Sequence, residues 1–222
     1  KNTVIYTVAG TSINLIVTLM AGYALSRNFI GKKWVNLYFV FTMFFSGGLI
    51  PTFLQVKSYG LYNSPWVLIL MGMISVWNVI IARTFIKNSL PDELYEAAVM
   101  DGCSHVWYFI KIVVPLSKAL IGVLVVYYAV AHWNDYMTGL VYISNRKYQP
   151  LQVVLKELLT SLQVTDSMSQ MLGDVADNEL MMRVAESVKY CAIVISTVPI
   201  LVLYSSMQKF FVKGVLIGSV KG

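Results

Sequence analysis

The residues with the clearest chemical character lie in the stretch 127–136, which reads YYAVAHWNDY. Tyr128, His132 and Asp135 are spaced so that they share one stripe of a helix. Aromatic rings beside hydroxyl and amide groups can stack on the apolar C–H faces of a sugar and hydrogen-bond its hydroxyls. The candidates for such a solute path in this stretch are Tyr127, Tyr128, His132, Trp133 and Asn134.

Two further candidates, Trp77 and Asn78, lie inside an apolar run. An amide buried between helices often hydrogen-bonds to a neighbouring helix, so this is the alternative role for Asn78. For Trp133 and Tyr136 the alternative is an aromatic belt at the outer face of the bilayer that the helices cross. These alternatives remain open at the level of sequence.

A second unusual stretch is ELYEAAVMDG, residues 93–102, which is acidic and rich in small side chains. Ser89 is a candidate N-cap, and Pro91 fits only the first turn of a helix. Asp92 suits the positive end of the helix dipole, and Gly102 can end the helix with a positive φ. We therefore expect a short helix that ends at the glycine, followed by a second, apolar helix over 104–113.

The short helix has the composition of a docking element. Ala97 and Ala98 have small side chains that let another backbone approach closely, and Glu96 and Asp101 offer acceptors to basic residues of a partner. An interfacial loop that merely reverses the chain is the alternative. The docking set is Glu96, Ala97, Ala98, Asp101 and Gly102.

No catalytic constellation is recognisable. The sequence has no phosphate-binding G-x-x-x-x-G-K-[ST] loop and no G-x-S-x-G motif. His105 and His132 stand in no metal or nucleophile motif, and Cys103 and Cys191 have no metal-ligand spacing. We expect no enzyme activity, no metal and no cofactor in this chain.

These candidates must be positioned by membrane helices. Of the 222 residues, 57% are hydrophobic and only 13% are charged, whereas a soluble domain has roughly a quarter charged residues. A helix needs roughly 20 mainly apolar residues to cross a bilayer. Five stretches qualify, which predicts an all-α membrane protein with five transmembrane helices at 3–25, 34–54, 66–86, 116–141 and 184–207.

The net charge of +6 is distributed as in a membrane protein, which argues against nucleic-acid binding. Basic residues flank the first and last spans on the side expected to be cytoplasmic, at Arg27, Lys32, Lys33, Lys209, Lys213 and Lys221. This places loop 87–115 and the C-terminus in the cytoplasm and segment 142–183 outside. Lys1 then lies outside, so we expect one more helix upstream, six in the full protein.

The outer segment 142–183 is long for a loop. Residues 151–162 carry apolar side chains at helical spacing, so we expect a helix there. Such a segment could contact an extracytoplasmic partner or lie on the membrane surface, and the sequence leaves both open.

Three motifs resemble a known family. Glu96-Ala97-Ala98, then Gly102, then 112–115 at the end of the second helix, looks like the EAA signature of ABC-importer permeases, with Val114 where leucine is usual. The stretch GYALSR at 22–27 and the tail 207–222 are similar to carbohydrate-importer permeases of the maltose-permease class.

The resemblance implies a type I ABC-importer permease fold in which residues 1–222 form a single transmembrane domain. It implies a coupling helix within loop 87–115 that docks on an ATPase, so that ATP and Mg belong to that partner. The expected partners are a second permease in a heterodimer, two ATPase subunits, an extracytoplasmic solute-binding protein and membrane lipid. A homodimer is the alternative for the permease pair.

The expected function is half of an alternating-access pathway that imports an oligosaccharide across a bacterial-type cell membrane. One alternative is an ABC importer for another solute, such as a peptide, an amino acid or phosphate. A second is an ATP-independent facilitator, which would leave the helix at 93–102 unexplained.

Overall fold

The structure is a computed structural model that describes the backbone of residues 1–172 and 175–218 and the side chains of residues 1–162 and 186–208. Within this part of the chain all regular structure is helical, which confirms the predicted all-α class. The first half contains α1 (Asn2–Ser26), α2 (Lys32–Phe44), α3 (Leu49–Ser58), α4 (Pro65–Leu70), α5 (Val76–Ser89) and α6 (Asp92–Met100). The second half contains α7 (His105–Tyr108), the π-helix η1 (Phe109–Val113), α8 (Val114–Leu116), α9 (Lys118–Trp133), α10 (Met137–Tyr142), the 3₁₀ turn η2 (Arg146–Tyr148), α11 (Leu151–Leu172) and α12 (Val175–Gly218).

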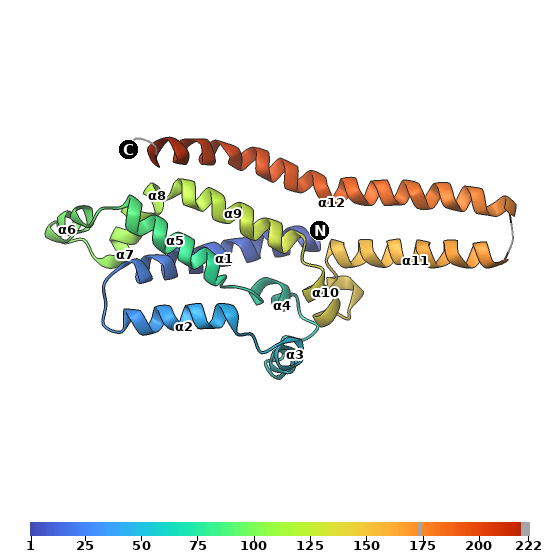
Figure 1. Ribbon diagram of the computed structural model, residues 1–222, viewed down its shortest axis with the longest axis horizontal. Helices are drawn as coiled ribbons and strands as arrows, with labels where there is room; N and C mark the ends of the chain where they lie inside the picture. The colour runs from blue at the N-terminus through green and yellow to red at the C-terminus, as the bar shows by residue number, and fades with distance from the viewer. Residues whose placement is uncertain (173–174, 219–222) are drawn as a thin grey trace.

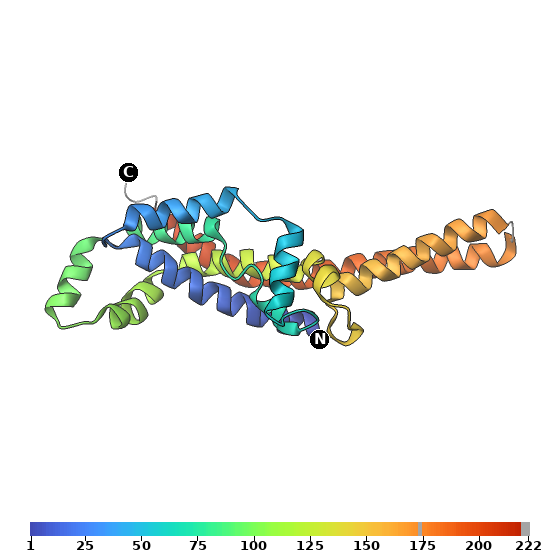
Figure 2. The same cartoon turned by 90° about the horizontal axis from the view of Figure 1, so that it is seen from below.

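Helix α1 is the central element of the bundle. It runs alongside α5 and α9 in both views (Figures 1 and 2), and it contacts both helices along their lengths. Leu19 of α1 is buried against Ala82 of α5 and Leu124 of α9. Gly22 allows the close crossing, because a Cβ there would lie 2.7 Å from the Ala82 Cβ and 3.1 Å from the Arg83 backbone nitrogen.

The two ends of the bundle differ. Helix α6 and the C-terminal end of α12 lie at one end, whereas α1 begins at the other (Figure 1). Helices α11 and α12 form a hairpin that extends beyond the other helices at the end where α1 begins. The helix expected over 151–162 is confirmed as the first half of α11.

Two helices of the described chain are long and apolar enough to cross a membrane, Asn2–Ser26 and Glu186–Gln208 within α12. They confirm helices at the first and last predicted spans. Two bent pairs raise the count to four if each pair is one span: α2 with α3, bent by 112°, and His105–Leu116 with α9, bent by 81°. The count of five spans is therefore not confirmed.

The breaks in the predicted spans have local causes. The prediction of one continuous helix over 66–86 is wrong, because α4 ends at Leu70 and α5 begins only at Val76. Gly72 takes a φ of +73° in the gap, and the Ser75 hydroxyl caps α5 by accepting from the Asn78 N–H. The predicted helix 34–54 is likewise interrupted between Phe44 and Leu49, where Gly48 has a φ of +83°.

The predicted helix 116–141 is also not continuous. Helix α9 begins at Lys118 and ends at Trp133, and the separate helix α10 follows. The Asp135 carboxylate accepts from the Thr138 N–H at 3.0 Å, so this acidic residue pairs with a backbone donor in the first turn of α10. Lys221 and the side chains of Lys209, Lys213 and residues 163–185 lie outside the part of the chain described here.

Candidate functional site

The C-terminal end of α6 lies where the sequence predicts it. The cap at its N-terminal end is a different residue from the predicted one. Gly102 has a φ of +75°, and the Cys103 N–H donates to the Ala98 carbonyl at 2.9 Å, which closes the helix as expected. Ser89 is not the cap, because α5 continues through this residue. Pro91 takes the N-cap position without a side-chain hydrogen bond, and Asp92 and Glu93 lie in the first turn.

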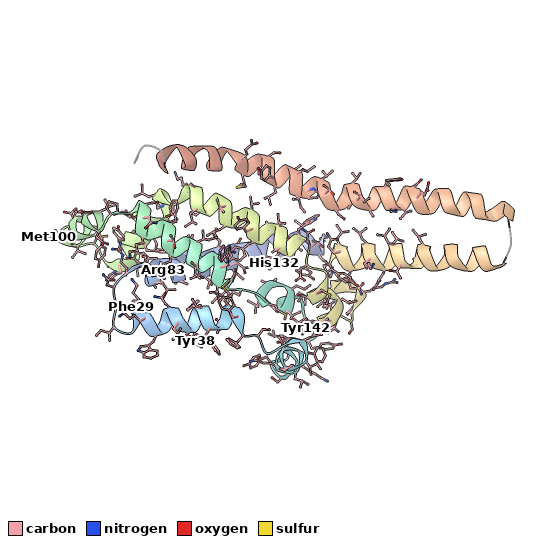
Figure 3. All side chains as sticks on the ribbon, viewed as in Figure 1. Phe29, Tyr38, Arg83, Met100, His132 and Tyr142 are labelled. Atoms are coloured by element: carbon pink, nitrogen blue, oxygen red, sulfur yellow. The ribbon has the colours of Figure 1, made fainter. Side chains whose placement is uncertain are left out.

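The two faces of α6 have different surroundings. Ala98 is only 7% exposed and belongs to a buried cluster of this same chain that includes Tyr23 and Tyr108, so the expectation that its side chain is exposed is wrong. The other docking candidates, Glu96, Ala97, Asp101 and Gly102, are exposed. Met100 is 87% exposed on the same helix, which Figure 3 labels at the edge of the molecule. Methionine is an adaptable contact residue, and the sequence analysis overlooked it.

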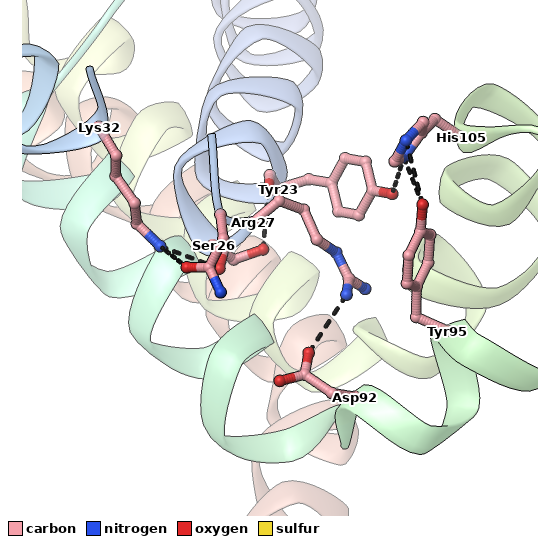
Figure 4. Close-up of polar contacts among 8 residues, drawn as sticks. Tyr23, Ser26, Arg27, Lys32, Asp92, Tyr95 and His105 are labelled. Carbon is pink, nitrogen blue, oxygen red and sulfur yellow. Dashed lines mark hydrogen bonds and ion pairs between the residues drawn. The ribbon is translucent and has the colours of Figure 1, made fainter. Parts of the chain in front are cut away.

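The inner face of α6 is held by Arg27, at the C-terminal end of α1. The guanidinium carbon lies 4.2 Å from the ring centroid of Tyr95 on α6, 5.1 Å from that of Tyr108 and 5.4 Å from that of Tyr23. Arg27 Nη1 also meets the Asp92 carboxylate at 3.3 Å (Figure 4). The sequence analysis missed this cluster, because its members come from α1, α6 and α7.

The ring contacts outweigh the ion pair in this cluster. Asp92 is 86% exposed, and ion pairs with solvent-exposed carboxylates contribute about 0–1 kcal/mol. The Arg27 side chain is only 17% exposed, and a partly desolvated cation over an aromatic face gains about 0.5–2 kcal/mol per contact. His105 adds contacts with two of the rings, at 3.3 Å from the Tyr23 hydroxyl and 3.0 Å from the Tyr95 hydroxyl.

The second predicted helix, 104–113, consists of α7 and the π-helical turn η1. The Ser104 hydroxyl caps it by accepting from the Trp107 N–H. Pro115 lies two residues after Val113, where the π-helical turn ends, and a proline that cannot donate to the preceding turn is compatible with the wider π spacing there. Only Tyr108 and Val113 of this segment are buried in the described chain, whereas Trp107 and Ile110 are more than half exposed.

Tyr128 and His132 face α1. The buried Tyr128 hydroxyl lies 2.6 Å from the Thr18 hydroxyl, and His132 Nε2 lies 3.2 Å from Asn14 Nδ2. Gly10 makes room for the imidazole, because a Cβ there would lie 2.5 Å from its ring atoms. These contacts join α1 to α9, so both side chains have structural partners within this chain.

The remaining path candidates fall into two groups. Asn78 is 7% exposed, and the Trp133 indole N–H donates to the Ser196 carbonyl of α12 at 2.9 Å. Trp77 is 58% exposed, Tyr127 is 52% exposed, and Asn134 is exposed and accepts from the Gln152 amide. The described residues contain no group of three or more His, Cys, Asp or Glu side chains that could hold a metal ion.

Comparison with known proteins relates this chain to a family. The profile of the family described as "Binding-protein-dependent transport system inner membrane component" matches residues 13–217. The polygalacturonan/rhamnogalacturonan transport system permease protein YtcP of Bacillus subtilis (strain 168) is 41% identical over 221 residues, which is 99% of this chain and 75% of that protein. Protein LplC of the same organism is 42% identical over 219 residues, 97% of this chain and 71% of that protein.

A solved structure is similar as well. It is the crystal structure of a bacterial ABC transporter involved in the import of the acidic polysaccharide alginate. The similar chain has a TM-score of 0.81 and 28% sequence identity, and the match covers 95% of the present chain and 73% of the solved one.

Proposed function

Since this chain belongs to the family of inner membrane components of binding-protein-dependent transport systems, we propose that it forms half of the alternating-access pathway of an ATP-driven oligosaccharide importer. It is an ABC-importer permease, a transport subunit and not an enzyme. The oligosaccharide assignment is supported by the printed functions of relatives, which include permeases for polygalacturonan/rhamnogalacturonan and for lactose.

The observation that carries the coupling proposal is the geometry of α6. A short helix with exposed Glu96, Ala97 and Met100 stands at one end of the bundle, and Gly102 ends it with a positive φ. We assign loop 87–115 to the cytoplasm, where α6 docks on the ATPase that holds ATP and Mg. In the same topology, five spans and a cytoplasmic C-terminus leave segment 142–183 outside, facing a solute-binding protein.

The partner permease is supported by exposed apolar surface. Helix α2 buries none of its side chains in this chain, although it carries Trp34, Phe41 and Phe44. In the apolar part of α12, within Glu186–Gln208, only 6% of the residues are buried in this chain. Within a membrane these faces meet lipid or a second helical subunit, and we propose that a different permease chain covers part of them, so that the pair is a heterodimer.

Copurification tests the assembly. A tagged copy of the full-length chain, extracted from the native membrane in mild detergent, is expected to bring down a second permease and an ATPase. If the tagged chain supports uptake but no ATPase copurifies with it, the ATP-independent facilitator is favoured.

Uptake competition tests the solute. We expect excess oligogalacturonides or neutral oligosaccharides such as raffinose to compete with the imported solute, and amino acids, dipeptides and phosphate not to compete. Competition by one of the latter alone would assign the importer to a non-sugar solute.

The path candidates lead to a prediction that separates structure from solute contact. Trp77→Ala and Tyr127→Ala remove exposed rings, so we expect a raised apparent KM for uptake and little change in the melting temperature of the purified complex. Tyr128→Phe leaves the buried Thr18 hydroxyl without its partner, which costs about 1–2 kcal/mol, so we expect a lower melting temperature with KM preserved.

Uptake kinetics and thermal unfolding of the same three variants check this prediction. A raised KM for Tyr128→Phe, with the melting temperature unchanged, would show that this hydroxyl meets the solute and that our division of the candidates is wrong.

A further inference from the structure

We propose that Arg27 is a positioning residue that ties α6 to the inner end of α1, so that movement of α6 is passed directly into the central helix of the bundle. The proposal rests on the proposed function, because it concerns how α6 transmits the movement of a docked ATPase. Its basis is the contact of one guanidinium with rings from three helices (Figure 4).

The contact is specific to a planar cation. The guanidinium carbon stands closest to the Tyr95 ring, at 4.2 Å, and Tyr95 is the residue that precedes the docking set on α6. A guanidinium can stack on an aromatic face, whereas the compact ammonium of lysine is more strongly hydrated. Since Asp92 is mostly exposed, the ion pair alone would not hold the helix against solvent screening.

Further contacts make the cluster a joint between α1, α6 and α7. The Tyr95 ring stacks on His105 at 5.3 Å between centroids and meets Tyr108 edge-on at 5.1 Å. Tyr23, one turn before Arg27 on α1, packs against Tyr108 at 6.1 Å and Phe109 at 5.3 Å. The inner end of α1 therefore contacts both helices that flank the turn at Gly102.

The joint leads directly to the helices that carry the candidate path. On the N-terminal side of Arg27, α1 crosses α5 closely where Gly22 meets Ala82. One turn further toward the N-terminus, the Thr18–Tyr128 hydrogen bond joins α1 to α9. A displacement of α6 that is passed through Arg27 to α1 thus reaches α5 and α9 together. The other route runs through the chain itself, from α6 across Gly102 and the π-helical turn η1 into α9.

The experiment measures whether α1 and α6 move as one body in the assembled transporter. Cys103 and Cys191 are replaced by serine, and spin labels are attached at Met20→Cys on α1 and Met100→Cys on α6, both exposed positions. The distance between the labels is measured by pulsed electron resonance without nucleotide and with ATP and vanadate. We expect one narrow distance distribution that is the same in both states.

Arg27→Gln is expected to broaden this distribution and to lower the amount of oligogalacturonide moved per ATP roughly tenfold, the size expected for the loss of a cation–π contact. Lys33→Gln removes a cation from an exposed position in the first turn of α2 and is expected to keep the narrow distribution. A distribution in Arg27→Gln as narrow as in the parent would overturn the proposal.

A second pair of variants decides the matter if Arg27→Gln does not assemble. Tyr95→Phe keeps the ring under Arg27 and removes only the hydroxyl contact with His105, so it is expected to resemble the parent. Tyr95→Leu removes the ring and is expected to broaden the distribution. Equal widths for the two variants would contradict the joint. If Tyr95→Leu does not broaden the distribution while Glu96→Lys blocks transport, only the proposed role of Arg27 is wrong. Unimpaired transport in Glu96→Lys would instead contradict the proposed function itself.

Discussion

Replacing Glu96 with lysine is expected to abolish ATP-driven uptake while the chain remains in the membrane. Glu96 lies on α6 and its side chain is exposed. The substitution therefore does not disturb the buried core of this chain. Reversing a charge that becomes desolvated against a partner costs about 2–5 kcal/mol, which weakens association at least about thirtyfold. Uptake by whole cells and the amount of chain in the membrane fraction check the result.

Lys33→Glu is the matched control, because it reverses an exposed charge of the same size outside α6. We expect it to keep most of the uptake. Undiminished transport in Glu96→Lys, or an equal loss in both variants, would count against docking through α6.

Gly102 offers a complementary pair of variants. Gly102→Pro cannot adopt the φ of +75° and loses the N–H that donates to the Val99 carbonyl at 2.9 Å, so it is expected to abolish uptake as well. Gly102→Ala adds a Cβ into open space and meets only the backbone cost of about 1–2 kcal/mol for a left-handed residue. Uptake should therefore be reduced in the alanine variant but not lost.

Gly22→Leu is expected to cause the second large effect, a loss of stability. A Cβ at this position would lie 2.7 Å from the Ala82 Cβ and 3.2 Å from the Ala82 carbonyl carbon, so backbone and not only side chain is in the way. Overpacking of this kind costs about 1–3 kcal/mol or more, and here it separates α1 from α5. Thermal unfolding of the purified complex should begin at a lower temperature.

Gly47→Leu is the control for this change. A Cβ at Gly47 would meet only the Pro51 Cβ, at an ordinary 3.8 Å, so the melting temperature is expected to change little. A Gly22→Leu complex as stable as the Gly47→Leu complex would mean that α1 and α5 do not cross closely in the membrane.

The helices were predictable wherever local chemistry decides the conformation. The apolar run of α1 and the positive φ of Gly102 follow from residue types alone. The gap between α4 and α5 was missed because Gly72 stands in a continuously apolar run, and hydropathy does not distinguish a broken helix from a straight one. The cap at Ser75 was a usable signal for the start of α5.

The site was predictable only in part, because orientation depends on tertiary contacts. Ala98 is buried in a cluster that also contains Tyr23 and Tyr108, and these two residues come from other helices. The inward direction of Tyr128 and His132 follows from polar residues of α1, Asn14 and Thr18, which a spacing analysis of α1 could have identified as a stripe facing another helix.

The most direct test of the central claim asks what the exposed tip of α6 touches in the assembled transporter. A photoreactive p-benzoylphenylalanine is introduced at Met100, and the same group at Leu158 of α11 serves as the control position. On irradiation of the native complex we predict that Met100 forms an adduct with the ATPase subunit and that Leu158 does not. An assembled complex in which Met100 reacts with lipid alone, or with no protein, would contradict the account.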